Sequence, residues 1–99
     1  MVVLAAIVEL DLHDAMSLKD KRGALKSLIA RLHREFNVAA AEVALHDAWH
    51  SAAIGLALVS TSAGHAESML ERILRWIELN RPDLEIAGHS QEILHFNVE

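Results

Sequence analysis

Basic residues gather in one segment of a chain that is otherwise acidic. The 99 residues carry a formal charge of −5 at pH 7, yet residues 17–36 carry +4, which leaves −9 on the rest. Four of these cations stand near the start of a predicted helix: Lys19, Lys21, Arg22 and Lys26. A helix N-terminus presents unpaired N–H groups and a partial positive charge, so it favours anions. The segment is therefore a candidate for binding RNA phosphates. The alternative is a solvated helix face balanced by Asp14, Asp20 and Asp47.

A second group of residues with usable chemistry lies at positions 46–50. His46, Asp47 and His50 are residues of the kinds that bind metal ions, and His13 is a possible fourth ligand at the same edge. Zinc accepts such ligands. These histidines straddle a predicted turn, however, and no H-E-x-x-H motif follows, so exposed turn residues are the favoured interpretation over a metal or small-ligand sensor. Trp49 is unusual in a turn, where Gly, Asn or Asp prevail. It must fold back over the sheet or meet a partner, for example by stacking on a base.

Nothing in the sequence indicates catalysis. The chain has no cysteine and no tyrosine, and its four glycines are not clustered into a phosphate-binding loop. The absence of cysteine also excludes a disulfide framework and a cysteine zinc site. The G-x-S-x-G motif of serine hydrolases is missing as well. We therefore predict a protein that is not an enzyme and that needs no cofactor.

Length and composition predict a single domain over residues 1–99. A typical domain has about 100–150 residues, and 53% apolar with 23% charged residues can fill one core. The longest apolar runs, 1–8 and 52–59, are far shorter than the about 20 residues of a membrane-spanning helix. Glu9 and Asp11 precede any signal-peptide cleavage site. We expect a cytoplasmic protein without a membrane partner.

Strands and helices must position these residues. The predicted strands are residues 2–12 and 84–98, and the second of them is interrupted at 88–90. The first predicted helix covers residues 17–36, with Ser17 as its N-cap. The second predicted helix lies between the turn at 61–64 and the stop signal Asn80-Arg81-Pro82. The alanine-rich start of residues 38–59 fits a helix as well as a strand–turn–strand, because alanine favours helix while the pattern allows either. Residues 54–60 favour a buried strand.

Several segments carry a resemblance to a known family. They are Ser17 to Arg22 (S-L-K-D-K-R), Phe36-Asn37-Val38, Ala41-Glu42-Val43, Asp47-Ala48-Trp49 and the glycine-containing strand 54–60. In them the chain resembles the bacterial YlxP family, also called DUF503, over nearly its whole length. The S-L-K-x-K-R and D-x-W motifs are the most specific. The resemblance implies a ferredoxin-like fold, which makes residues 38–59 two strands. The family's genes neighbour those for translation initiation and ribosome maturation, which implies a link to RNA by association.

The implied order β-α-β-β-α-β is an α+β fold with a four-stranded antiparallel sheet and two helices on one face. The first strand's end, the first helix's start, the 46–50 turn and the second helix's end then meet at one edge. This gathers the candidate RNA-binding residues Lys19, Lys21, Arg22, Lys26 and Trp49.

The opposite face of the sheet is predicted to be open and apolar. Val3, Ala5 and Ile7 would lie on it with apolar partners from the third strand, and self-association into a dimer or larger is the simplest cover. We predict a small non-enzymatic protein that binds RNA or a ribonucleoprotein at the helix edge. The alternative is a homo-oligomeric protein–protein interaction module with no nucleic-acid role.

Overall fold

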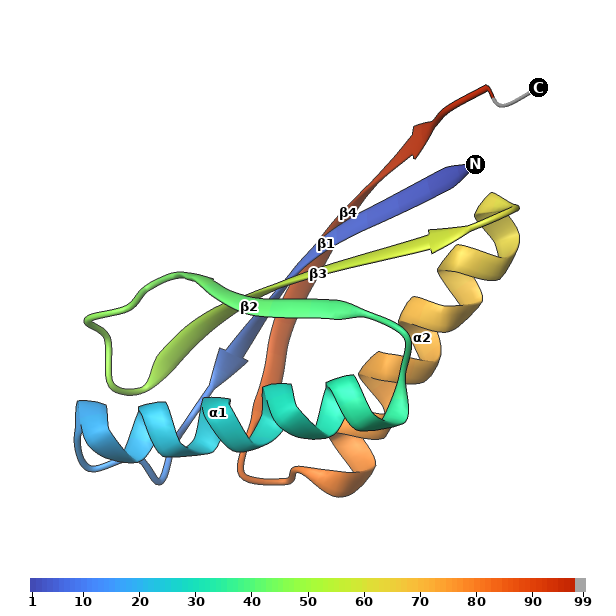
Figure 1. Cartoon of the computed structure of the whole chain (residues 1–99). Helices are drawn as coiled ribbons and strands as arrows, with labels where there is room; N and C mark the ends of the chain where they lie inside the picture. Colours follow the sequence, from blue (N-terminus) through green and yellow to red (C-terminus); the bar gives the residue numbers. More distant parts are fainter. Residues whose placement is uncertain (98–99) are drawn as a thin grey trace.

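The fold has the predicted ferredoxin-like α+β arrangement. A computed structural model describes residues 1–97 (Figure 1). The elements in chain order are β1 (Val2–Asp11), α1 (Leu18–Glu35), β2 (Ala39–Ala44), β3 (Ser51–Ser60), α2 (Ala63–Asn80) and β4 (Glu85–His95). Residues 38–59 thus form two strands, as the family resemblance implies. Neither helix is long and apolar enough to cross a membrane within the described residues.

The four strands form one antiparallel sheet in the order β2-β3-β1-β4. Strand β1 pairs with β3 from Val2↔Ser60 to Asp11↔Ser51. On its other side β1 pairs with β4. Glu9 pairs with Gly88 and the next residue, Leu10, pairs with Ile86, so β4 has a bulge between Ile86 and Gly88. The predicted interruption of the last strand at 88–90 is therefore wrong. The strand is continuous from Glu85 to His95, and its only register shift is the bulge before Gly88.

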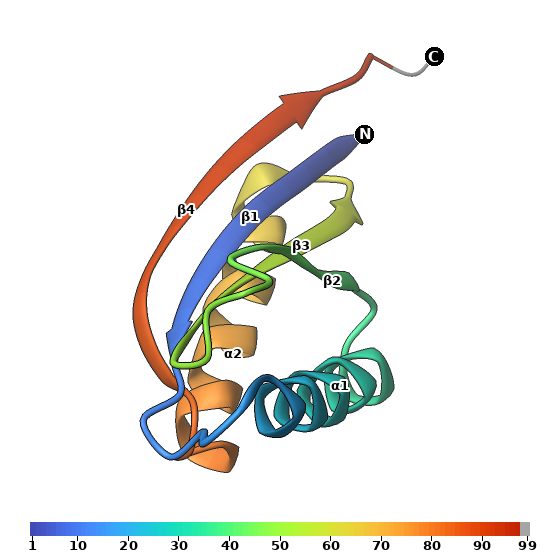
Figure 2. The same ribbon diagram turned by 90° about the vertical axis from the view of Figure 1, so that its left-hand side faces the viewer.

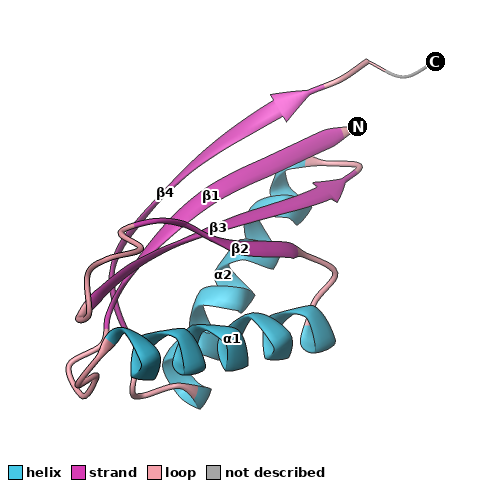
Figure 3. Cartoon of the chain, turned by 60° about the vertical axis from the view of Figure 1, so that its left-hand side comes forward, coloured by secondary structure: helices cyan, strands magenta, loops and turns pink. Residues whose placement is uncertain are grey.

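Both helices cover the same face of the sheet, which Figure 3 shows as cyan helices below magenta strands. Figure 2 shows the bend of β4 and how the start of β1 and the end of β4 extend beyond α1. The core lies between the layers. Its fully buried large side chains include Leu4, Val8 and Leu10 of β1, Leu28 and Leu32 of α1, Ile54 of β3, and Leu70, Ile73 and Ile77 of α2.

Helix α1 begins at the predicted cap Ser17, and α2 begins at Ala63, inside the predicted turn 61–64. The Ser17 hydroxyl accepts a hydrogen bond from the Asp20 backbone N–H at 3.1 Å, and the Ser62 hydroxyl accepts one from His65 N–H at 3.2 Å. Each serine has extended backbone angles and satisfies a helix N–H that would otherwise lack a partner. These caps fix where α1 starts, and so where its basic residues lie.

Tertiary packing makes the alanine-rich segment a strand. Strand β2 is a short edge strand in which Ala40 packs against the core. A bulge between Glu42 and Ala44 leaves Val43 half-exposed beside Gly55. A Cβ on Gly55 would lie 2.7 Å from Val43 Cγ1, so a larger residue there would force the Val43 side chain to move.

Candidate nucleic-acid interface

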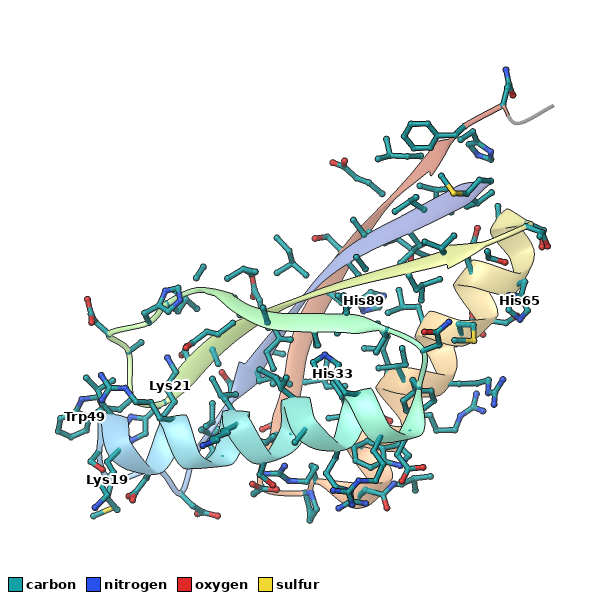
Figure 4. The ribbon with its side chains drawn as sticks, viewed as in Figure 1. Lys19, Lys21, His33, Trp49, His65 and His89 are labelled. Atoms are coloured by element: carbon teal, nitrogen blue, oxygen red, sulfur yellow. The ribbon has the colours of Figure 1, made fainter. Side chains whose placement is uncertain are left out.

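The chain segments predicted to meet at one edge do meet there. The Leu12 backbone N–H donates to the His50 carbonyl at 2.8 Å, and the His50 ring Nε2 lies 2.9 Å from the Ala15 carbonyl. From the end of α2, Arg81 donates to the Ala24 carbonyl of α1 at 3.3 Å. In Figure 4, Lys19, Lys21 and Trp49 lie at the same end of the molecule, beside the first turns of α1.

Lys21 is not part of the exposed surface, which corrects the prediction that it contacts phosphate. Its side chain is only 1% exposed. The ammonium donates to the backbone carbonyls of Leu45 and Ala48, the second at 2.7 Å, and forms an ion pair with Glu42 at 3.2 Å. An ammonium has three donors and no acceptor. The two carbonyls take two of its donors and Glu42 pairs with its charge, so the buried Lys21 is not available to a ligand.

These bonds fasten the loop between β2 and β3 to α1. Leu45 has a φ of 62°, a left-handed conformation that costs a non-glycine residue roughly 1–2 kcal/mol. Its carbonyl also accepts the Ala48 N–H at 3.1 Å, which closes the turn. Lys21 therefore stabilises a strained loop, and that loop carries Trp49.

The pair with Glu42 is largely removed from water. The Glu42 side chain is 22% exposed, and the oxygen nearest Lys21 is buried without a hydrogen bond of good geometry among the described residues. This oxygen is held by the charge of Lys21 alone. Removing that charge would leave a carboxylate oxygen buried and unpaired.

The other three predicted cations, Lys19, Arg22 and Lys26, are exposed. Their spacing of three and four residues places them along one face of α1. Arg22 and Lys26 line a groove between α1 and β2, together with His33 and Glu42. Within residues 1–97 none of the three forms an ion pair. The row is therefore available to an anionic partner.

The N-terminus of α1 contributes less to anion binding than predicted. The Asp20 N–H is taken by Ser17, and the Asp20 carboxylate accepts a hydrogen bond from the Met16 N–H at 3.0 Å. This places a negative charge in the first turn, where it stabilises the helix. The side-chain cations are therefore the main groups at this end that could attract an anion.

Trp49 remains 49% exposed at the tip of the loop. Its ring meets the His50 ring edge-on, with centroids 6.4 Å apart. Figure 4 places the indole beside the end of α1 that carries Lys19. The side chain is thus only partly packed, and about half of its surface is open to a stacking partner.

The residues 46–50 do not supply a compact ligand set. His50 contacts a backbone carbonyl, while His46 and Asp47 are exposed. Among the described residues, the group whose ligand atoms lie within 4.8 Å of one another is Asp11, His13 and Glu85. Of the four residues considered from sequence, only His13 belongs to this group. The β1–β4 register that pairs Asp11 with Glu85 could not be read from the sequence.

The contact between His13 and Glu85 predicts a pH effect. Their side chains meet at 2.6 Å, and this hydrogen bond raises the pKa of His13. The folded state therefore favours the imidazolium. The pair stabilises the protein below the ordinary imidazole pKa of about 6.5, and the contribution is lost as pH rises through the raised value. An NMR titration of the ring protons should show this, and Glu85→Gln should return the pKa toward its ordinary value. An equal pKa in both proteins would contradict the contact.

Comparison with known proteins identifies the family. A family model described as a protein of unknown function (DUF503) matches residues 3–91. The chain belongs to the DUF503 family. It is 38% identical over 74 residues to the uncharacterized protein YlxP of Bacillus subtilis (strain 168), a match that covers 75% of this chain and 79% of that protein.

The two most specific segments of the family resemblance are in contact. Lys21, from the S-L-K-D-K-R segment, donates to the carbonyl of Ala48 in the D-A-W segment. Ser17, in the first segment, caps the helix that holds Lys21. The two motifs thus pack against each other. The buried Lys21 holds the loop against α1, while Lys19 on the helix and Trp49 on the loop stay exposed.

Proposed function

We propose that this DUF503 protein is a non-enzymatic cytoplasmic protein that binds RNA or a ribonucleoprotein through the surface formed by Lys19, Arg22, Lys26 and Trp49. The observation that carries the proposal is the half-exposed indole at the end of a row of exposed cations on α1 that form no ion pair within residues 1–97. Cations attract phosphates, and an aromatic ring stacks on a base of any sequence. Together they provide both contacts that a single-stranded or loop RNA offers.

The overall charge limits the affinity. A net charge of −5 repels RNA at long range, so the row must act locally. We expect weak binding that depends on RNA structure, because unpaired bases are needed for stacking. Uniform coating of any polyanion is not expected.

The dependence of RNA affinity on salt tests the role of the cations. Each phosphate that a cation neutralises releases counterions, so log K falls linearly with log salt. In the double variant Lys19→Ala and Lys26→Ala, the slope should fall by about one unit per lost contact. The measurement is fluorescence anisotropy with structured and single-stranded RNA. The matched control removes two exposed cations from α2, Arg72 and Arg75, and should leave the slope unchanged.

Trp49→Ala should act differently in the same assay. Loss of a stacked base costs about 1–3 kcal/mol, and the salt slope should stay nearly constant because no charge is removed. Absence of binding at low salt, or equal binding by the Lys19/Lys26 double variant, would favour the second candidate function.

That second candidate is a homo-oligomeric protein–protein interaction module with no nucleic-acid role. The observation that favours it is the open face of the sheet, where Ile7 and Val59 are 45% and 62% exposed. Large apolar side chains gathered on one face are usually covered by a partner. This face lies opposite the helices, so self-association and RNA binding can be tested separately.

A further inference from the structure

The open face of the sheet is divided into an apolar half and an acidic half. Register places Val3 between Val59 of β3 and Leu94 of β4, and Ala5 beside Ala57. At the same end, the backbones of Met1 and Phe96 hydrogen-bond to each other. The exposed large side chains of this half are Met1, Ile7, Val59, Leu94 and Phe96, each 45–62% exposed.

The other half of the same face carries carboxylates. Glu9 is exposed on β1, and Asp11 pairs in register with Glu85 of β4. The His13 ring contacts Glu85 at this end. Basic residues that could neutralise a second copy's carboxylates are absent from the described strand positions of this face. Two such halves brought together would repel each other.

We infer that a second copy of this chain covers the apolar half, sheet against sheet about a two-fold axis, with the acidic halves left outside the contact. The inference rests on the self-association function proposed as second candidate. A two-fold contact sets the same patch against itself, so the patch must be self-complementary. The apolar half meets this condition better than the acidic half, because among its described strand positions it carries a single carboxylate, Glu92 beside Ala5, and that residue lies on the edge strand β4. A basic partner, by contrast, would be drawn to the acidic half.

The size of the apolar half sets the strength of the contact. Met1 to Ile7 spans about 20 Å along β1, and the three strands β3, β1 and β4 span about 14 Å, so the footprint is roughly 300 Å² per copy. A stable interface buries about 800 Å² per partner. A depression lined by Ala5, Ile7, Ser90 and Glu92 can receive a side chain from the other copy and add contact area. The dimer is therefore expected to be weak and to dissociate on dilution.

Sedimentation velocity over a wide concentration range tests the inference. The unaltered protein should move from monomer toward dimer as concentration rises. Val59→Lys should weaken dimerisation by about tenfold or more, because a buried unpaired lysine is too costly to keep in the contact. Ile7→Lys should do the same. Both positions are solvent-exposed in the monomer, and circular dichroism confirms that each variant is folded. Leu94→Lys replaces either variant that fails to fold.

The matched control is Glu9→Lys, in the acidic half of the same strand. It should leave the dimer intact or strengthen it. A protein that stays monomeric at all concentrations would overturn self-association altogether. A dimer that survives Val59→Lys and Ile7→Lys but is lost in Glu9→Lys would leave self-association standing and overturn the assignment to the apolar half.

Discussion

Replacing Lys21 by alanine should lower the free energy of unfolding by about 3–5 kcal/mol, the usual cost of breaking a buried ion pair by removing one partner. The lysine is 1% exposed, and its loss leaves the Glu42 oxygen buried without a counter-charge. The carbonyls of Leu45 and Ala48 lose their donor as well. Equilibrium unfolding in urea, followed by circular dichroism, measures the change.

Two comparisons separate this effect from a simple loss of charge. Lys19→Ala removes an exposed lysine two residues earlier and should stay within about 0.5 kcal/mol of the unaltered protein. The double variant Lys21→Met with Glu42→Gln removes both charges and should cost less than Lys21→Ala, because no unpaired charge remains. If Lys21→Ala were as mild as Lys19→Ala, the buried position of Lys21 would be wrong.

Leu32→Ala should destabilise the protein by about 2–5 kcal/mol, through lost apolar burial and the cavity left behind. Leu32 and Leu28 are both fully buried against the sheet. Leu32 lies nearer the centre of the apolar stripe of α1 and should cost more than Leu28. Urea unfolding measures both, and Arg34→Ala on the exposed side of the same helix is the control. A near-neutral Leu32→Ala would contradict the packing of this helix.

Local signals in the sequence predict the helices well. Serine caps and the Asn80-Arg81-Pro82 stop act within a few residues, so Ser17 and Asn80 mark helix ends as expected, and the predicted turn 61–64 contains the second cap, Ser62. The alanine-rich segment is ambiguous in sequence because alanine favours helix, whereas packing beside β3 makes it a strand. Among the sequence observations, only the family resemblance predicts the strand.

The candidate site was predicted in position but not in detail. Topology brings Lys19, Arg22 and Trp49 to one edge, but it does not tell a surface lysine from a buried one. A signal for Lys21 was present: it stands four residues before Leu25, on the stripe that continues to Leu28 and Leu32. A lysine on that stripe must find buried acceptors, and here loop carbonyls supply them. Those acceptors come from distant residues and could not be read from sequence.

Recovery of bound RNA from cells tests whether the surface formed by Lys19, Arg22, Lys26 and Trp49 binds RNA. The protein is purified at low salt from its own cells beside a variant carrying Lys19→Ala, Lys26→Ala and Trp49→Ala, and the bound material is divided for nuclease treatment. We predict that the unaltered protein retains nuclease-sensitive RNA, that high salt releases it, and that the variant retains much less. Unaltered protein without RNA, or equal RNA on the variant, would show that this surface does not bind RNA.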